Sequence, residues 1–577
     1  MNTTAASAVQ SIDWLAIAPP TLTALVGLVV LVADLFLAER HKPLLGWVAV
    51  AGLAVAGLSL LPLRAGDRST FCLVSDGDVC SYVADDFTVA IQLLVLGGAL
   101  LTALLSLHTV TEQKLPAGEY WFLLLSSAAG AALLPASRDL ATLVIALEVA
   151  SLPAFALVGM RRDDRRSSEA ALKFFLSSVV ATAVTLLGVS FVYATTGGMH
   201  VATVAEGLTQ VDPRLETLAR TGVALTLIGF AFKTAAVPFH FWVPDTYVGA
   251  PLPIAAYLSV IGKAVGFTGL IVVTVRAFPS YADVWGPAIA VLAALTMTVG
   301  NVAALRQRPE HAHSAVRLLA WSSVGQAGYL LVPIAAAGYA DSTADAEHAI
   351  GATVAYALMY AAVNLGAFAV VALVAHTTRR ADDGTGHRLT DHRALYATHP
   401  LAALALGFLL LCLAGLPPGV IGLFAKVAVF SAVVDAGLGW LAVVMAVNVV
   451  IALYYYLQWT AALFRAPAPT EAPAPASGPT AAPARPATPA DPPGEAATPP
   501  GPATDATTTA SPAAGGLALR APAPADGQPL PTGATPDRVR PRVPATLTAT
   551  VVLTTAIGIA LSGAPQLVLR FASGTLF

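Results

Sequence analysis

The chain has 577 residues, of which 56% are hydrophobic and only 11% carry a charged side chain. Soluble domains carry roughly 25% charged residues, so this composition excludes a soluble enzyme and a disordered protein and indicates a polytopic membrane protein. The net charge of −3 does not favour nucleic-acid binding. Three cysteines without a CxxC pair, and the lack of GxGxxG and Walker motifs, predict no metal or cofactor site.

Apolar segments recur along the whole chain, and a membrane helix needs about 20 mostly apolar residues. We predict an all-α polytopic fold with fourteen transmembrane helices. The predicted spans are residues 16–38, 44–63, 86–108, 119–137, 140–160, 170–195, 219–243, 249–275, 283–304, 315–338, 348–376, 400–434, 437–464 and 545–564.

The basic residues of the loops predict the orientation of these spans, because cytoplasmic loops are enriched in Lys and Arg. With residues 465–544 left out, fourteen basic residues fall in one set of alternate loops and six in the other. The richer set includes the sequence RRDDRR at 161–166, which we interpret as a solvated topology signal. We therefore expect both termini on the outer side of the membrane.

We interpret two of the predicted spans as broken helices. Residues 400–434 are too long for one straight crossing and contain the sequence GLPPG at 415–419, while Pro238 and Pro244 interrupt or follow the span at 219–243. Proline removes a helical hydrogen bond, and unwound backbone at membrane depth is tolerated only where it is buried in protein or lines a watery cavity. Paired broken helices are typical of inverted repeats with a transport path at their midplane.

Residues 465–544 have a different composition, because they hold 21 of the 41 prolines together with Ala, Thr, Gly and Asp. Such a sequence cannot bury enough apolar surface to offset its ordering entropy. We predict a disordered loop on the inner side, between the last two spans. A neutral insertion is favoured over a proline-rich docking site, which stays an alternative.

Four ionisable residues lie deep within predicted spans. A charge at the bilayer centre costs about 2.5–3.5 kcal/mol, so such residues mark functional sites by default. Structural ion pairs would explain at most one pair, because a single glutamate faces three lysines. A buried lysine whose acidic partner comes and goes can release and regain a proton near neutral pH. We therefore predict a proton path through Glu148, Lys233, Lys263 and Lys426.

Some further polar residues are weaker candidates. His240 follows Pro238 within the predicted break, which favours a position lining the path. Lys173 and Asp34 lie near inward ends of spans, where a snorkelled or surface-paired role competes with a relay role, and His376 is a lesser candidate of the same kind.

The three cysteines fall in two settings. Cys72 and Cys80 lie in the loop 64–85, which the charge pattern puts outside, where disulfides persist. We predict that they form a disulfide, against the alternative of two free thiols in a flexible loop. Cys412 lies inside a broken span, where we expect it to act as a small apolar packing residue.

The sequence around the buried charges contains recognisable motifs. Residues 232–259 read FKTAAVPFHFWVPDTYVGAPLPIAAYLS and residues 410–430 read LLCLAGLPPGVIGLFAKVAVF. Residues 317–331 read RLLAWSSVGQAGYLL, and residues 169–178 read EAALKFFLSS. These stretches resemble the proton-pumping membrane subunits of respiratory complex I. Three features resemble subunit N rather than subunits L and M. They are the form WVPDTYVGAP, a lysine at position 426 and the lack of a long lateral helix.

The resemblance implies an antiporter-like fold in which helices 4–8 and 9–13 form inverted repeats and helices 7 and 12 are broken. It also implies a division of the chain into 1–115 with helices 1–3, 116–280 and 281–464 with the two repeats, 465–544 with the cytoplasmic loop, and 545–577 with helix 14.

The resemblance also implies roles for single residues. Glu148 on helix 5 would pair with Lys233 on helix 7, Lys263 on helix 8 would sit centrally, and Lys426 on helix 12 would gate the far half-channel. Gln326 stands where the family often has a histidine. The link between Lys263 and Lys426 is therefore left open to ordered water or to lysine rotamers.

The implied function is a proton-translocating subunit of NADH:quinone oxidoreductase in a bacterial cell membrane. Flavin and iron–sulfur clusters are expected in partner subunits and not in this chain, and the implied neighbours are the membrane subunits M, J and K. A subunit of a multi-subunit cation/proton antiporter is the alternative. An autonomous solute permease is disfavoured, because no cluster of Asn, Ser, Asp or Arg occurs at mid-depth.

Overall fold

The structure is a computed structural model of the chain, and it describes residues 12–73, 79–378, 387–466 and 543–572. The elements below belong to one compact unit formed by Met1–Pro467 and Pro541–Phe577. The predicted loop 465–544 lies almost entirely outside the described residues, so its disorder stays a prediction.

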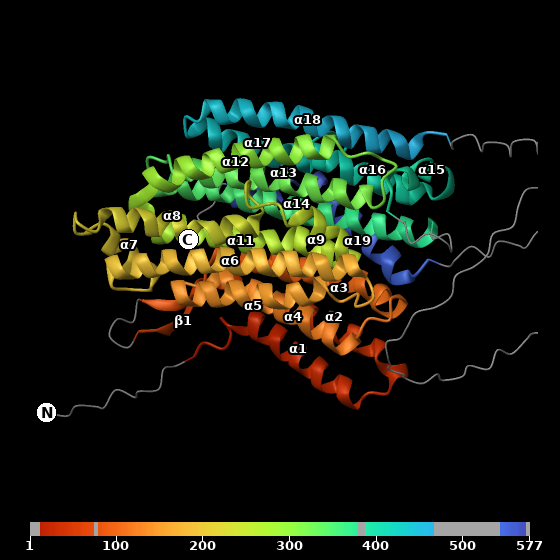
Figure 1. Ribbon diagram of the computed structural model, residues 1–577, viewed down its shortest axis with the longest axis horizontal. Coiled ribbons are helices and arrows are strands. Elements are labelled where there is room, and N and C mark those ends of the chain that lie inside the picture. The colour runs from red at the N-terminus through yellow and green to blue at the C-terminus, as the bar shows by residue number, and fades with distance from the viewer. Residues whose placement is uncertain (1–11, 74–78, 379–386, 467–542, 573–577) are drawn as a thin grey trace, which may run out of the picture. The chain divides into compact units, whose positions relative to one another are not determined.

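Helices account for nearly all of the regular structure, as the composition predicts (Figure 1). Leu258–Gly262 and Val272–Ala277 are π-helical turns that flank α11, so Leu252–Ala277 forms one span. The helices are α1 Ala18–Phe36, α2 Pro43–Leu58, α3 Asp86–Glu112, α4 Ala117–Leu133, α5 Leu140–Val158, α6 Arg165–Thr196, α7 Val201–Leu208, α8 Glu216–Thr234, α9 Val243–Gly249, α10 Leu252–Tyr257, α11 Lys263–Ile271, α12 Ala282–Leu305, α13 Ser314–Ala337, α14 Thr343–Thr378, α15 Leu395–Thr398, α16 Pro400–Ala414, α17 Val420–Asp435, α18 Gly439–Phe464, α19 Ala545–Gly563 and α20 Gln566–Leu569.

Within the described residues, twelve helical segments are long and apolar enough to cross a membrane. They run side by side along a common direction, with α1 and α18 on opposite sides of the bundle (Figure 1). The most buried spans are Ser314–Ala337 and Leu252–Ala277. In their 18-residue apolar windows, 94% and 89% of the residues are buried. A helix that is apolar all round and still buried lies in the core of a large bundle.

The two remaining predicted spans are not continuous helices. In the first, α8 ends at Thr234 and α9 begins at Val243, so turns occupy residues 235–242. In the second, α16 ends at Ala414 and α17 begins at Val420. Both interruptions coincide with the proline-containing sequences that predict them.

The loop 64–85 contains a two-stranded antiparallel hairpin. It consists of β1, Arg68–Cys72, and β2, Cys80–Ala84. Cys72 and Cys80 are paired across the two strands and form a disulfide, which confirms the predicted bridge.

Aspartates fix the starts of several helices. Asp85, Asp139 and Asp164 precede α3, α5 and α6, and each side chain accepts a hydrogen bond from the first turn. An N-cap of this kind satisfies backbone donors that have no partner within the helix.

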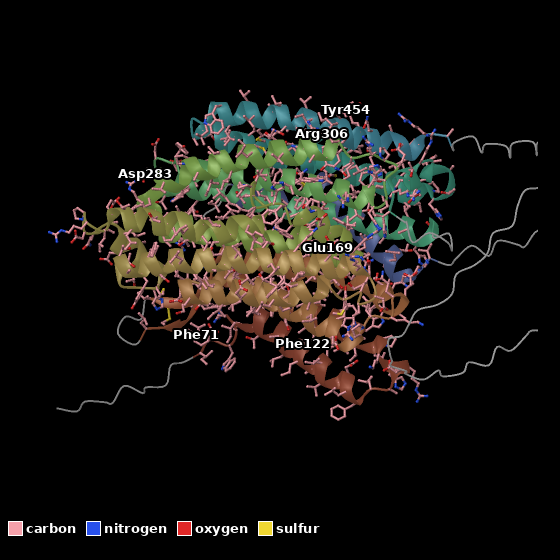
Figure 2. The ribbon with its side chains drawn as sticks, viewed as in Figure 1. Phe71, Phe122, Glu169, Asp283, Arg306 and Tyr454 are labelled. Carbon is pink, nitrogen blue, oxygen red and sulfur yellow. A yellow bond between two sulfur atoms is a disulfide. The ribbon has the colours of Figure 1, made fainter. Side chains whose placement is uncertain are left out.

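The outer face of the bundle is apolar. Large side chains point outward from α18, among them Tyr454, which is 56% exposed (Figure 2). In water such a surface would be unfavourable, whereas lipid or an adjoining membrane protein covers it without cost.

Candidate functional site

Lys233 lies in the last turn of α8 and is 4% exposed. Its Nζ donates a hydrogen bond to Ser178 Oγ on α6 at 2.7 Å. The rings of Phe155 and Phe174 lie 4.9 and 5.3 Å from the same nitrogen, so aromatic faces surround the rest of the ammonium group. A cavity of about 20 Å³ beside Lys233 has room for about one water molecule.

Glu148 lies on α5 and is half-buried. Its Oε1 accepts a hydrogen bond from Thr182 Oγ1 at 2.6 Å. Among the ion pairs of the described residues, none joins Glu148 to Lys233, so the expected direct pair is not formed in this structure. The two charges instead bind hydroxyl groups on the same helix, α6.

The close approach of α6 to α8 makes this arrangement possible. A Cβ atom at Gly188 on α6 would collide with the backbone nitrogen of Thr226 on α8. Thr185 Oγ1 accepts a hydrogen bond from the Gly229 backbone at 2.8 Å in the same contact. The lack of a side chain at Gly188 therefore brings Ser178 within reach of Lys233.

Lys263 is the first residue of α11 and is 1% exposed. Its Nζ lies 3.4 Å from the carbonyl oxygen of Thr234, which is the last residue of α8. The last carbonyls of a helix have no partner within the helix and carry partial negative charge, which suits an ammonium group. The π-helical turn directly before Lys263 is of a kind often found at functional sites.

Lys426 repeats this relationship in the second half of the chain. It lies on α17, is 5% exposed, and its Nζ donates to the carbonyl oxygens of Leu413 at 2.9 Å and Ala414 at 2.7 Å. These residues end α16, on the other side of the interruption. In both halves, a buried lysine therefore lies against the carbonyl end of a helix that stops inside the bundle.

Gln326 on α13 joins several buried polar groups. Its side-chain nitrogen donates to the hydroxyl of Tyr456 at 3.0 Å and lies 3.5 Å from the carbonyl oxygen of Leu413. Its side-chain oxygen accepts a hydrogen bond from Tyr356 on α14. Since Lys426 donates to the same Leu413 oxygen, Gln326 lies next to the environment of that lysine.

Polar side chains of α14 contact the span that carries Lys263. Asn364 donates to Ser259 Oγ at 2.6 Å, and Tyr360 donates to the Ser259 carbonyl oxygen at 3.2 Å. Ser259 lies one helical turn before Lys263 in the same span. Buried hydroxyl and amide groups of α14 thus pack one turn away from Lys263 along its span.

Comparison with known proteins identifies the family. Residues 137–452 match the family model described as "NADH:quinone oxidoreductase/Mrp antiporter, TM". The chain is 68% identical to NADH-quinone oxidoreductase subunit N 2 of Streptomyces griseus over 99% of this chain and 96% of that protein. The chain belongs to the subunit N family of NADH-quinone oxidoreductases. It is 45% identical to the subunit N of Salinispora tropica, over 81% of this chain and 88% of that protein.

Solved structures share the fold of this subunit N family member. A chain of respiratory complex I from Thermus thermophilus matches with a TM-score of 0.67 and 27% identity, over 96% of this chain and all of that one. A chain of the Mrp complex from Dietzia matches with a TM-score of 0.70 at 21% identity, over 96% of each chain. The antiporter-like fold is thereby shown, and the chain is a multi-pass membrane protein.

The weaker candidates have different surroundings. His240 is half-buried in the turns between α8 and α9, and its ring lies 5.5 Å from that of Trp321. Lys173 pairs with Glu169 at 2.8 Å and Asp245 at 3.0 Å, with each of the three side chains at least 42% exposed, which fits the surface-paired alternative.

The remaining weak candidates also have charged partners. Asp34 lies 3.6 Å from the Nζ of Lys42, and His376 lies 3.7 Å from Glu112. The interpretation of RRDDRR as only a solvated signal was incomplete. Arg161 in this sequence donates to the carbonyl oxygen of Gly249 at 2.6 Å and so binds the end of α9.

The sequence analysis did not identify Ser178 and Thr182 as the hydroxyl partners of Lys233 and Glu148. Ser178 and Thr182 are spaced by four residues in an apolar helix, which puts them on one face. That spacing was a signal in itself, because buried polar groups need partners.

Proposed function

We propose that this chain is a proton-translocating membrane subunit of a bacterial NADH:quinone oxidoreductase. The observation that carries the proposal is the row of three buried lysines, two of which lie against the carbonyl ends of interrupted helices. An isolated charge in such surroundings is expensive, so a lysine that is retained there has a use. The names and structures of the relatives support the same activity.

The proposed fold has fourteen transmembrane helices, with α8–α9 and α16–α17 as the broken helices 7 and 12. The twelve continuous spans and the two interrupted ones support this number. Residues 1–115 form helices 1–3, residues 116–280 and 281–464 the two inverted repeats, and residues 545–577 helix 14. Both termini lie on the outer side.

In the proposed relay, Glu148 and Lys233 form a pair that opens and closes across the hydroxyls of Ser178 and Thr182. Lys263 exchanges a proton with Lys233 near the end of α8. From Lys263 the path continues past the polar groups of α14 and Gln326 to Lys426, which gates the far half-channel, while His240 lines it. The chain of hydrogen bonds around Gln326, which stands where the family often has a histidine, supports this route.

The partners of this subunit are other membrane subunits of the complex, and we propose subunit M and the small subunits J and K as the neighbours. The flavin and iron–sulfur clusters that oxidise NADH and reduce quinone belong to partner subunits. This chain contributes proton transfer alone.

NADH-driven acidification of inverted membrane vesicles tests the proposal. Lys263→Ala should abolish most acidification and slow coupled quinone reduction, while Lys114→Ala, which changes an exposed lysine, should leave both unchanged. Normal pumping by Lys263→Ala contradicts the relay. Sodium-driven proton exchange without NADH that depends on Lys263 supports instead the cation/proton antiporter, the alternative that shares this fold.

A further inference from the structure

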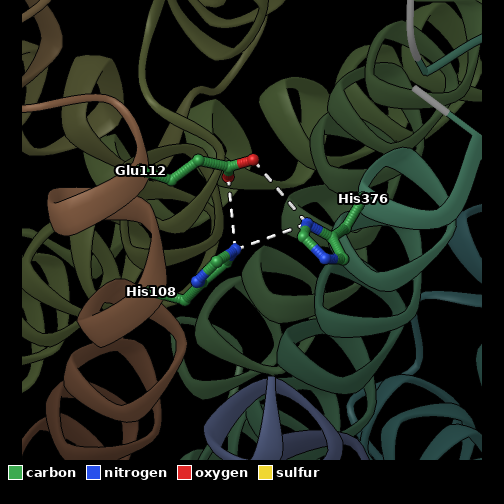
Figure 3. A group of neighbouring side chains, drawn as sticks. All are labelled: His108, Glu112 and His376. Atoms are coloured by element: carbon green, nitrogen blue, oxygen red, sulfur yellow. Dashed lines mark hydrogen bonds and ion pairs between the residues drawn. The ribbon is translucent and has the colours of Figure 1, made fainter. Parts of the chain in front are cut away.

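Two histidines and one glutamate meet at the ends of α3 and α14, far along each helix from the relay. His108 and Glu112 are one turn apart in the last turns of α3, and His376 lies in the last turn of α14. Figure 3 shows the three side chains directed toward a common point. The proposed function uses none of them.

With one ligand atom taken from each residue, the three atoms lie within 4.8 Å of one another, so small side-chain rotations would bring them to the spacing of a tetrahedral metal site. His108 Nε2 lies 3.3 Å from His376 Nδ1 and 3.4 Å from a Glu112 oxygen, and His376 Nδ1 lies 3.7 Å from the other Glu112 oxygen. Zinc binds imidazole nitrogen at about 2.0–2.1 Å and carboxylate oxygen at about 2.0–2.2 Å with tetrahedral geometry. Two ligands of one tetrahedron at those bond lengths are separated by about 3.3–3.4 Å.

The identity of the side chains selects the class of metal. Two imidazoles and a carboxylate suit Zn²⁺ and its transition-metal relatives, whereas Mg²⁺ and Ca²⁺ prefer oxygen ligands alone. His108 and Glu112 are spaced by four residues, which presents both on one face of α3. The side chains of His108, Glu112 and His376 are 27%, 27% and 16% exposed, so the group is partly shielded from solvent.

We propose that His108, Glu112 and His376 form a binding site for Zn²⁺ or a related transition-metal ion that links α3 to α14. Three protein ligands leave the fourth tetrahedral position for water. α14 also carries Tyr356, Tyr360 and Asn364, so the ion would fix the end of a helix that contributes to the buried polar region. The composition could not indicate this site, because its two histidines are 268 residues apart in the chain and none of its ligands is a cysteine.

Co²⁺ titration of the purified full-length chain in detergent tests the proposal, because tetrahedral Co²⁺ gives visible absorption bands that octahedral Co²⁺ lacks. We expect one saturable site whose bands disappear on addition of Zn²⁺ and persist in excess Mg²⁺. His108→Ala and His376→Ala should each weaken Zn²⁺ binding at least tenfold, since loss of an outer-shell partner alone costs about 10–100-fold in metal affinity. His311→Ala, which removes an exposed histidine elsewhere, should bind as the wild type does.

Several results would overturn the site. If the wild-type chain shows no tetrahedral Co²⁺ bands, the site is contradicted without any variant. Full binding by His376→Ala would show that α3 alone holds the ion, against the link between helices. Glu112→Gln, which keeps the size of the side chain, separates loss of the carboxylate ligand from misfolding and should also weaken binding.

Discussion

Ser178 and Thr182 lie one helical turn apart on α6, and their hydroxyl groups bind the side chains of Lys233 and Glu148. Ser178 accepts a hydrogen bond from Lys233, and Thr182 donates one to Glu148. The charges are therefore held apart by neutral hydroxyls in this structure. A side-chain rotation that exchanges these hydroxyl partners for a direct contact would close the proposed pair.

Ser178→Ala should lower NADH-driven proton pumping. A hydrogen bond to a charged group contributes about 1.5–3 kcal/mol, so its removal changes the protonation equilibrium of Lys233 by about tenfold or more. The measurement is vesicle acidification at matched rates of NADH oxidation. Ser177→Ala is the control, because Ser177 Oγ bonds only the Lys173 and Phe174 carbonyl groups of its own helix. Equal pumping by both variants would contradict the role of Ser178.

Lys426→Arg should lower NADH-driven proton pumping almost as much as Lys426→Ala. Arginine keeps the positive charge but does not release its proton at physiological pH, and its planar group cannot point one compact ammonium at the Leu413 and Ala414 carbonyls. We expect pumping to be slower by about a hundredfold or more, on the scale of lost general acid–base catalysis. Lys173→Arg is the matched control, since Lys173 lies in exposed ion pairs. Normal pumping by Lys426→Arg would mean that deprotonation is not needed at this position.

Gln326→Leu should impair both folding and pumping. The change leaves the hydroxyl of Tyr356 without the acceptor it has in this structure and removes the donor to Tyr456. A buried polar group without a partner costs about 1–3 kcal/mol, so the thermal midpoint of the purified chain should fall. Gln307→Leu, at the half-buried end of α12, should change the midpoint less. A stable Gln326→Leu chain that pumps normally would exclude Gln326 from the path.

The positions of the buried charges could be predicted from the sequence, but their partners could not. Glu148, Lys233, Lys263 and Lys426 stand out because charge is rare in apolar spans. A hydroxyl such as that of Ser178 does not stand out, because serine is common in membrane helices and usually bonds its own backbone. Only the packing of α6 on α8 shows that Ser178 contacts Lys233, whereas its neighbour Ser177 bonds the backbone of its own helix.

The helix interruptions could likewise be predicted from the sequence, but the contacts made at them could not. Proline and glycine predict the interruptions near residues 235–242 and 415–419, because their effect on the backbone is local. The alignment of a lysine with the carbonyl end of each interrupted helix depends on contacts between segments far apart in the chain. One such contact is at Gly266 on α11, where a Cβ atom would collide with the backbone of Thr234.

Loss of the disulfide should change stability and leave proton transfer intact. Cys72→Ser with Cys80→Ser removes a bridge that closes a loop of eight residues in sequence separation. The chain-entropy account predicts a cost of about 2–3 kcal/mol to the ordering of the hairpin. Proteolysis within the hairpin should become faster while NADH-driven acidification stays at the wild-type level. Alkylation of both cysteines in the denatured, non-reduced wild-type chain would contradict the bridge itself.

His392 should make the stability of the chain depend on pH. It is the last residue of η7, Leu389–His392, and is fully buried, and burial lowers the pKa of its imidazole to about 4, with the Arg388 carbonyl acting in the opposite direction. The ordinary pKa is about 6.5, so the unfolded chain binds this proton first as the pH falls. Stability is therefore complete above about pH 6.5 and is lost as the pH falls toward 4.

The size of this effect allows a direct measurement. Between pH 8 and pH 5 the single site should cost about 2 kcal/mol of unfolding free energy. Thermal midpoints of the purified chain across this range should therefore fall more steeply for the wild type than for His392→Gln. Burial, followed by the charges of Arg166, Arg161 and Arg317, also lowers the pKa of His313 to about 4, so the variant keeps part of the slope. Parallel slopes for both chains would show that His392 takes up no proton on unfolding in this range.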